Sequence, residues 1–308
     1  MRVAGLILVA ALAVLSMLAS GCLSRTEGKL GHASFSYEEC LFGCAVGDNA
    51  LAAGGASAVI QLQLESGYSF TQIRSTVPSV AQFSLGTGLT IDVSAGAPGA
   101  TQLELIDGAG RLVDSVTVTV KPTATLAITK GWSGSAPLVL EGSQQIFHVT
   151  TKDGGGQTLI GSGAVRFDVG PPLRLLPALT AGDTLAFSGA PGSGSIAARC
   201  NSANALQPVT VVPLAALKSI DATVGPNSVE GQNSYANVDV VAHGAGGDVY
   251  GATCSWTVSD PSVTVASQVA SSLESAPRAS TRLLLARAGS FSARCAIGAL
   301  STSVQLHR

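Results

Sequence analysis

The chain has little charge and few aromatic residues. Charged side chains make up 12% of its 308 residues and aromatic side chains 5%, whereas soluble domains average about 25% charged residues. The formal net charge is −2, and Lys and Arg form no run or stripe. Nucleic acid, which binds clustered positive charge, is therefore not an expected partner. After the N-terminal apolar run, no segment reaches the roughly 20 apolar residues that a membrane-spanning helix needs.

Sequence patterns for catalysis and metal binding are also missing. The chain has no nucleophile elbow, phosphate-binding loop or zinc-protease motif. No two of the four His residues have metal-ligand spacing; they are His32, His148, His243 and His307. The segments 107–111 and 153–156 are predicted to be turns, because Asp and Gly tolerate positive φ. We expect a non-catalytic protein without cofactor or metal.

Glycine is abundant, at 36 residues. Short stretches, such as residues 59–64 and 115–120, alternate apolar with polar side chains. This alternation buries one face of a β-strand. Together with turn residues about every 8–12 positions, it predicts an all-β chain of sandwich type.

A seven-residue pattern recurs at a period of 95 residues. Residues 194–200 (GSIAARC) match residues 289–295 (GSFSARC), and residues 99–105 (GATQLEL) stand one period earlier. Each copy is a turn of small residues followed by an alternating strand. Such self-similarity is the signature of tandem units. It predicts three domains, over residues 51–122, 123–213 and 214–308.

Two segments resemble the central signature of bacterial Ig-like group 2 domains, a Trp strand followed by Ser-x-Pro-x-Val. They are residues 254–265 (CSWTVSDPSVTV) and, without the Trp, residues 73–83 (IRSTVPSVAQF). In the middle domain the resemblance is weak, because Pro171 and Pro172 fall near the signature and the Trp is missing. The resemblance implies tandem Ig-like sandwiches that act as spacers or adhesive modules, with no catalytic residues.

The N-terminus resembles the signal peptide of a bacterial lipoprotein. Arg2 precedes an apolar run over residues 3–15, and the small residues 19–21 stand directly before Cys22. In that family the Cys thiol accepts a diacylglyceryl group before the signal peptide, here residues 1–21, is removed. Leu18 departs from the pattern, because it stands four residues before Cys22 where the family prefers three. A plain secretory signal and an uncleaved anchor are the alternatives.

Lipidation of Cys22 would hold the protein outside the cytoplasm on a membrane. Lipoproteins carry two or three acyl chains, enough for stable attachment, whereas one chain binds reversibly. Leu23 after the Cys, rather than Asp, favours the outer membrane in a Gram-negative species. The sequence predicts that residues 22–50 form a lipid-anchored tether.

Five further cysteines follow Cys22, and disulfides can form in an exported protein. Cys254 and Cys295 are 41 residues apart, on an early and a late strand of the third domain. By the Ig-like resemblance, they are expected to form an inter-sheet disulfide. Trp256 follows Cys254 by two residues and therefore faces the same side of its strand. We expect it to be a core residue rather than a ligand platform.

The other three cysteines are less clearly assigned. Cys40 and Cys44 have three residues between them, which suits a small disulfide loop. A metal site that also used His32, Glu38 and Glu39, or a pairing of either residue with Cys200, is the alternative. Cys200 is the repeat counterpart of Cys295, but its expected partner position holds Ala164. The sequence therefore predicts a buried thiol there.

These features favour a lipid-anchored cell-envelope protein that is structural, adhesive or a spacer. Its partners would be the membrane, through the lipid, and a protein or glycan. The alternatives are a carbohydrate- or peptide-binding module and an accessory subunit of an envelope enzyme. Sugar binding usually uses exposed aromatic side chains, and the candidates are Trp132, Tyr235 and Tyr250.

Overall fold

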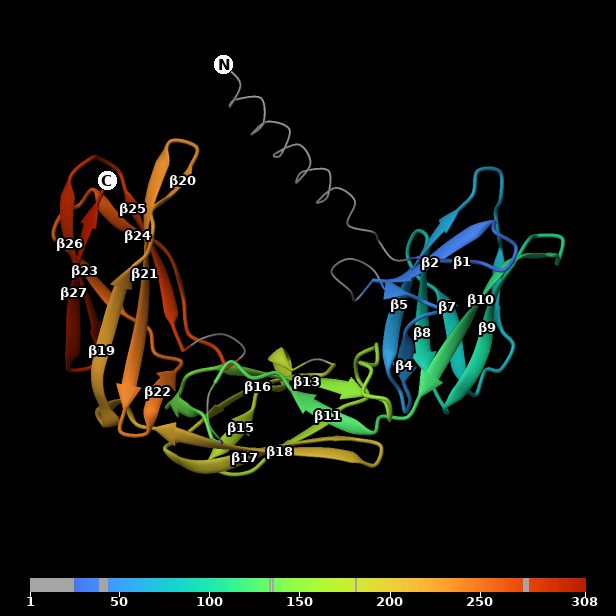
Figure 1. The fold of residues 1–308 in the computed structure, drawn as a ribbon, viewed down its shortest axis with the longest axis horizontal. Helices are drawn as coiled ribbons and strands as arrows, with labels where there is room; N and C mark the ends of the chain where they lie inside the picture. Colours follow the sequence, from blue (N-terminus) through green and yellow to red (C-terminus); the bar gives the residue numbers. More distant parts are fainter. Residues whose placement is uncertain (1–24, 39–43, 133, 135, 181, 274–276) are drawn as a thin grey trace, which may run out of the picture. The chain divides into compact units, whose positions relative to one another are not determined.

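The chain is all-β, as predicted. The computed structural model describes residues 25–38, 44–132, 134, 136–180, 182–273 and 277–308. Within them the only helices are two short 3-10 turns, η1 (Pro177–Leu179) and η2 (Leu214–Ala216), so no described helix could cross a membrane. The chain divides into two compact units (Figure 1). Unit 1 comprises the residues up to Ala124 and Thr151–Ala164, and unit 2 comprises Thr125–Thr150 and Val165–Arg308.

Unit 1 is a sandwich of two sheets. The first has the order β1 (Thr26–Glu27), β2 (Ala33–Tyr37), β5 (Ser57–Leu64), β8 (Thr90–Ala95) and β7 (Ala81–Leu85), with β3 (Cys44–Ala45) also on β2. The second has the order β4 (Ala50–Ala52), β10 (Leu112–Lys121), β9 (Gly99–Ile106) and β6 (Gln72–Ser75). The inward side chains of both sheets form one core, in which Phe35, Ile60 and Leu103 are fully buried.

Unit 1 begins earlier than the sequence analysis predicts. The described part of the expected tether, residues 22–50, forms strands of the sandwich rather than a linker. β2 pairs with β5 from Ala33 opposite Leu64 to Tyr37 opposite Ile60. Burial of large aromatic side chains such as Phe35 and Tyr37 strongly favours folding. The core therefore requires this segment.

Residues 151–164 also belong to unit 1, although the sequence predicts that they lie in the second domain. Leu51 bridges Ile160, and Ser57 bridges Ser162. Lys121 Nζ donates a hydrogen bond to Asp153 Oδ2 at 2.6 Å. The chain thus leaves unit 1 at residue 124, returns at 151 and leaves again after 164. The predicted range 123–213 is not a single unit.

Unit 2 contains three sheets. The first has the order β11 (Thr125–Ile128), β13 (Gln145–Lys152), β16 (Thr184–Gly189) and β15 (Leu173–Leu175). The second, here called the long sheet, has the order β14 (Arg166–Val169), β17 (Gly192–Cys200), β18 (Ala203–Val212), β12 (Leu138–Leu140), β22 (Gly247–Tyr250), β21 (Asn233–Gly244), β25 (Ala279–Leu285) and β24 (Val263–Val269). β19 (Leu217–Val224) and β20 (Ser228–Glu230) also pair with β21. The third has the order β23 (Ser255–Val258), β26 (Ser290–Ile297) and β27 (Leu300–His307).

The long sheet crosses the predicted boundary at residue 213 through strand β12. On one side β12 pairs in parallel with β18, with Val139 opposite Val211. On the other side it pairs in parallel with β22, with Val139 opposite Tyr250. Leu138 and Leu140 also pack against the C-terminal core. One three-residue strand therefore joins two sandwich layers into a continuous sheet.

The 95-residue repeat corresponds to a recurring hairpin. Its three copies fall on β9, β17 and β26, and each pairs antiparallel with the following strand. Gly99 and Gly289 enter their strands with φ of +154° and +148°. A Cβ at Gly99 would also lie 2.9 Å from the Val80 side chain. These two repeat positions therefore favour glycine.

The two Ig-like signatures are strand–turn–strand crossings between sheets. Residues 73–83 contain most of β6 and the first part of β7, which lie in different sheets of unit 1. Residues 254–265 contain β23 and the start of β24, which lie in different sheets of unit 2. In the middle of the chain, β14 and β15 make the same crossing, with Pro171 and Pro172 between them. The prolines therefore occupy the crossing where the sequence match is weak.

We predict that Val139→Pro uncouples the two halves of unit 2. Proline removes the Val139 backbone N–H from a central strand, where ladder hydrogen bonds hold the sheet together. Val139→Ala keeps that N–H and loses only two methyl groups. Thermal unfolding followed by calorimetry should split the unit 2 transition for Val139→Pro, whereas Val139→Ala should only lower the temperature of an unsplit transition. Equal behaviour of the two variants would contradict the bridging role of β12.

Candidate functional site

Cys22 and Cys40 lie outside the described residues. Cys44 is disulfide-bonded and stands at the start of β3, opposite Tyr37 of β2. The Cys40–Cys44 loop and the lipidation of Cys22 therefore stay predictions. Cys200 ends β17 and is buried, as predicted.

Cys254 and Cys295 form a disulfide, as predicted, with their Cα atoms 5.2 Å apart. The bond does not connect facing sheets, however. Cys254 directly precedes β23, and β23 pairs with β26, which carries Cys295. The chain has already crossed from the long sheet at β22 to the third sheet before it reaches β23. The disulfide therefore joins neighbouring segments at the edge of one sheet.

The aromatic candidates for sugar binding are mostly unavailable. Trp132 and Tyr250 are buried, and the Tyr250 hydroxyl donates a hydrogen bond to the Gly131 carbonyl at 2.9 Å. Tyr235 lies beneath the Arg282 guanidinium, 4.2 Å from its ring centroid. Trp256 packs against the C-terminal core, and its Nε1–H donates to Thr281 Oγ1 at 3.2 Å. Trp256 therefore has the predicted core position.

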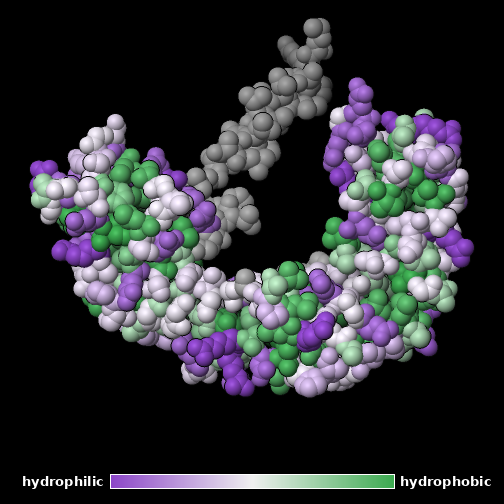
Figure 2. Space-filling view, turned by 180° about the vertical axis from the view of Figure 1, so that it is seen from behind, coloured by the Kyte–Doolittle hydropathy of each residue, from purple (hydrophilic) through white to green (hydrophobic). Residues whose placement is uncertain are grey.

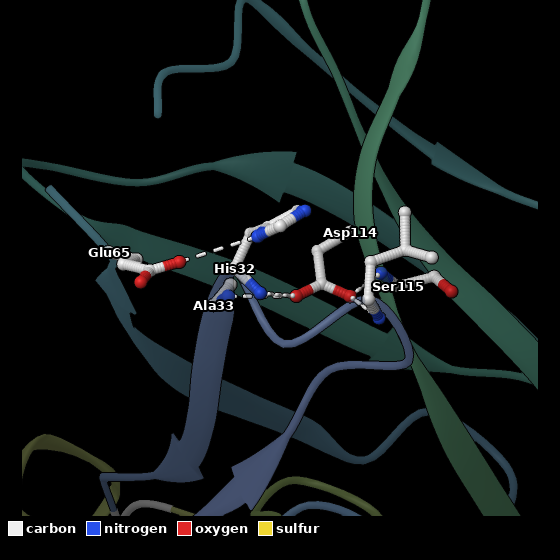
Figure 3. Close-up of polar contacts among 6 residues, drawn as sticks. His32, Ala33, Glu65, Asp114 and Ser115 are labelled. Carbon is white, nitrogen blue, oxygen red and sulfur yellow. Dashed lines mark hydrogen bonds and ion pairs between the residues drawn. The ribbon is translucent and has the colours of Figure 1, made fainter. Parts of the chain in front are cut away.

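The strongest polar cluster surrounds Asp114, a fully buried residue of β10. Its carboxylate accepts hydrogen bonds from the backbone N–H groups of Leu30, His32 and Ala33 at 2.8–2.9 Å, and from that of Ser115 at 2.7 Å (Figure 3). Four donors compensate for taking the charge out of water. Asp114 thus fixes the turn between β1 and β2 onto the opposite sheet.

The Asp114 cluster also explains a local glycine. A Cβ at Gly28 would lie 2.3 Å from the Asp114 carboxylate, so only glycine lets the turn approach this group. Beside it, His32 stacks on Tyr68, with ring centroids 3.9 Å apart. His32 Nδ1 lies 3.4 Å from Glu65 Oε2. The sequence gives no local signal for this site, because its parts are about 80 residues apart.

A second polar cluster lies on the outer face of the long sheet. His243 places Nδ1 2.8 Å from Asp248 Oδ1 and Nε2 3.1 Å from Asp221 Oδ2. These residues, with Asp239 and Arg278, line a groove of about 500 Å³. Both ring nitrogens of His243 are engaged, so its role in this arrangement is to connect β19, β21 and β22.

A second depression, of about 480 Å³, lies on the outer face of the first sheet of unit 1. Gln82, Asp92 and Ser94 are among its lining residues. Its lining combines polar and apolar side chains. Figure 2 likewise shows apolar and polar residues interspersed on the visible face of each unit. Within the described part of the chain, no three His, Cys, Asp or Glu residues are grouped to hold a metal ion.

Two acidic residues stabilise turns. Asp107 Oδ1 accepts hydrogen bonds from the backbone N–H groups of Arg111 and Ala109, and these, with the Arg111 side chain, lower the pKa of Asp107. Residues 107–111 are thus the predicted turn. In the β23–β24 crossing, Asp260 Oδ1 accepts from the Ser262 hydroxyl and backbone N–H at 2.6 and 2.8 Å. These bonds, together with the Arg287 guanidinium, lower the pKa of Asp260 to about 2.

No protein-family model matches the chain, and no curated protein matches it. Among solved structures, domains 4–9 of the surface layer protein SbsC are 17% identical with a TM-score of 0.30, and the match covers 82% of this chain and 42% of that one. The Escherichia coli adhesin FdeC is 13% identical with a TM-score of 0.27, over 92% of this chain and 98% of that one. The D00-D0 domain of intimin is 13% identical with a TM-score of 0.25, over 59% and 98%.

We predict that Asp114→Ala strongly destabilises unit 1. It leaves four backbone N–H groups without their acceptor, and an unsatisfied buried donor costs about 1–3 kcal/mol. We therefore expect the free energy of unfolding to fall by about 3 kcal/mol, as measured by denaturant titration. Asp107→Ala, in an exposed turn, is the matched control and should cost about 1 kcal/mol or less. Similar losses of unfolding free energy in the two variants would argue against this role of the buried Asp114 carboxylate.

We predict that Asp260 makes stability depend on pH in the acid range. Its pKa is about 2 in the folded protein against an ordinary 3.8, so the unfolded chain binds this proton more tightly. The stabilisation is complete above the ordinary value and is lost as pH falls toward 2. In Asp260→Asn the melting temperature should change less between about pH 5 and pH 2.5 than in the wild type. An unchanged pH dependence in Asp260→Asn would contradict this role of the carboxylate.

Proposed function

We propose that this chain is a lipid-anchored, non-catalytic cell-envelope protein that spaces or presents surfaces through rigid Ig-like sandwiches. The observation that carries the proposal is the long sheet, which runs without interruption from β14 to β24 through β12. Sandwiches joined by backbone ladders on both edges of one strand keep their spacing, whereas flexible linkers do not. A fixed distance between attached parts is what a spacer supplies.

Further contacts stiffen the joint at β12, where the long sheet connects the two parts of unit 2. The Gly131 N–H donates to the Leu273 carbonyl at 2.7 Å, and the Gly131 carbonyl accepts from the Tyr250 hydroxyl. The Glu141 carboxylate accepts from the Leu214 N–H at 2.8 Å. Each contact links residues that are at least 70 positions apart in the chain. The Tyr250 hydroxyl and the Glu141 carboxylate are thus engaged in holding the fold.

The clusters around Asp114, His243 and Asp260 point the same way. In each, the carboxylates accept hydrogen bonds from neighbouring strands or turns rather than facing an enclosed cavity. A glycan-binding role receives less support, because the aromatic candidates Trp132 and Tyr250 are buried. A protein partner remains part of the proposal.

The lipid anchor rests on the sequence before residue 23. We predict that Cys22→Ser, combined with a plain secretory signal peptide in place of residues 1–21, moves the protein from the membrane fraction of cells to the soluble extracytoplasmic fraction, because the signal peptide is still removed while the thiol that accepts the lipid is gone. Cell adhesion or capture of surface partners should be lost together with anchoring. Fractionation with detection by antibody, and an adhesion assay, measure both effects.

Cys200→Ser is the matched control for thiol chemistry and should leave fractionation unchanged. Membrane retention of Cys22→Ser would overturn the anchor. Full adhesion by the released protein would overturn the role of the sandwiches as anchored spacers.

A further inference from the structure

Four chain connections of unit 1 meet at one end of the sandwich. They are residues 28–32, 65–71, 86–89 and 107–111, here called the turn end. Hydrogen bonds show that they are neighbours: Glu65 N–H donates to the His32 carbonyl and Leu62 N–H to the Leu89 carbonyl, both at 2.9 Å. Thr71 N–H likewise donates to the Ile106 carbonyl, beside the last connection. Figure 1 shows the β5–β6 and β9–β10 connections at the same end of unit 1.

The turn end carries exposed apolar side chains. Five large hydrophobic residues, each between 41% and 54% exposed, lie in these connections or at the strand ends beside them. They are Leu30, Tyr68, Leu85, Leu89 and Leu112. The other exposed large hydrophobic residue among the described residues of unit 1 is Val77, which precedes β7 at the opposite end. Clustered exposed apolar residues mark surfaces that contact a partner or a membrane.

Two of these side chains are held in place by buried anchors. The Asp114 carboxylate accepts hydrogen bonds from the backbone N–H groups of Leu30 and His32. The His32 ring in turn stacks on Tyr68. Leu30 and Tyr68 are therefore presented by a fixed scaffold, so contact with a partner costs little ordering entropy.

The N-terminal chain enters unit 1 through β1, which runs toward this end and places Thr26 opposite the third residue of β2. Thr26 pairs with Phe35 of β2, and its Oγ1 accepts a hydrogen bond from Gly47 N–H at 2.9 Å. Only Leu23, Ser24 and Arg25 stand between Thr26 and Cys22. Four Cα–Cα steps of about 3.8 Å limit the span to about 15 Å. A lipid on Cys22 would therefore hold unit 1 against the bilayer surface, without the long tether that the sequence predicts.

The opposite end of unit 1 is already used. There Leu51 bridges Ile160, and the Ala53 N–H donates to the Lys121 carbonyl at 2.9 Å, close to where the chain leaves for residue 125. The turn end has no such chain crossing among the described residues. It is the end that can face a flat surface while the rest of the chain departs from the far end.

We propose that the turn end seats on the lipid bilayer, with its Leu side chains and Tyr68 in the interfacial layer. This inference rests on the proposed lipid at Cys22. Tyr is a residue type enriched at membrane–water interfaces, and Lys29 beside Leu30 can face lipid phosphates. The charges of Glu65 and Asp107 offset those of Lys29 and Arg111, so the contact is mainly apolar. The short connection at residues 23–25 then serves to hold unit 1 in one orientation.

The test uses the full acylated protein in vesicles of phosphatidylcholine with a minority of phosphatidylglycerol. An environment-sensitive fluorescent amino acid replaces Leu89 in one sample, Leu85 in a second and Val77 in a third. Lipids brominated in the acyl chains act as quenchers. Because interfacial contacts reach about 5–10 Å into the headgroup and acyl boundary, the probes at Leu89 and Leu85 should lose at least about half of their emission. The probe at Val77 should lose none.

Mass spectrometry of the same samples separates the two levels of the argument. If Cys22 carries no lipid, the proposed anchor fails, and the seating fails with it. If Cys22 carries lipid but the probes at Leu89 and Leu85 are not quenched, the seating alone is overturned. If the emission of these probes changes only after a protein is added, the turn end belongs to a protein partner, and the seating is also overturned. Equal quenching at Val77 would contradict an end-on orientation.

Discussion

Each strand must find partners for its backbone N–H and C=O groups, and in unit 2 this constraint is met through β12. This strand is three residues long, too short to be stable alone, yet it pairs with β18 on one edge and β22 on the other. Each flanking strand would otherwise end a sheet with an exposed row of polar groups, which invites aggregation. The same pairing that hides two edges also fuses two sandwiches. The continuity of the sheet across β12 is thus a consequence of protecting the edges.

In unit 1 a side chain performs a comparable task. In the turn between β1 and β2, several backbone N–H groups have no strand carbonyl placed to accept their hydrogen bonds. The Asp114 carboxylate accepts three of them and also the N–H of Ser115. The ion needs these donors as much as the turn needs an acceptor, because neither can keep its water inside the sandwich. The clamp therefore joins the two sheets where no backbone ladder could.

Local patterns predicted the features that depend on neighbouring residues. Alternation and the 95-residue repeat predicted the strands β9, β17 and β26, and the Ig-like resemblance predicted the Cys254–Cys295 bond, although as a bond between sheets. The pairing of β2 with β5 and the double pairing of β12 were not predicted, because strand partners distant in sequence leave no periodic signal. Asp114 was missed for the same reason. A single Asp in an alternating strand looks like a solvent-facing residue until the turn that covers it is known.

The strand order of unit 1 gives its two ends different roles. Four connections gather at the turn end, while residues 158–162 and the exit at residue 124 occupy the other. A chain that enters near one end and leaves from the opposite end adds the length of the sandwich to the distance between its attachments. A chain that entered and left at the same end would add almost none. With a lipid close to Thr26, the exits at residues 124 and 164 would lie at the end of unit 1 that faces away from the membrane.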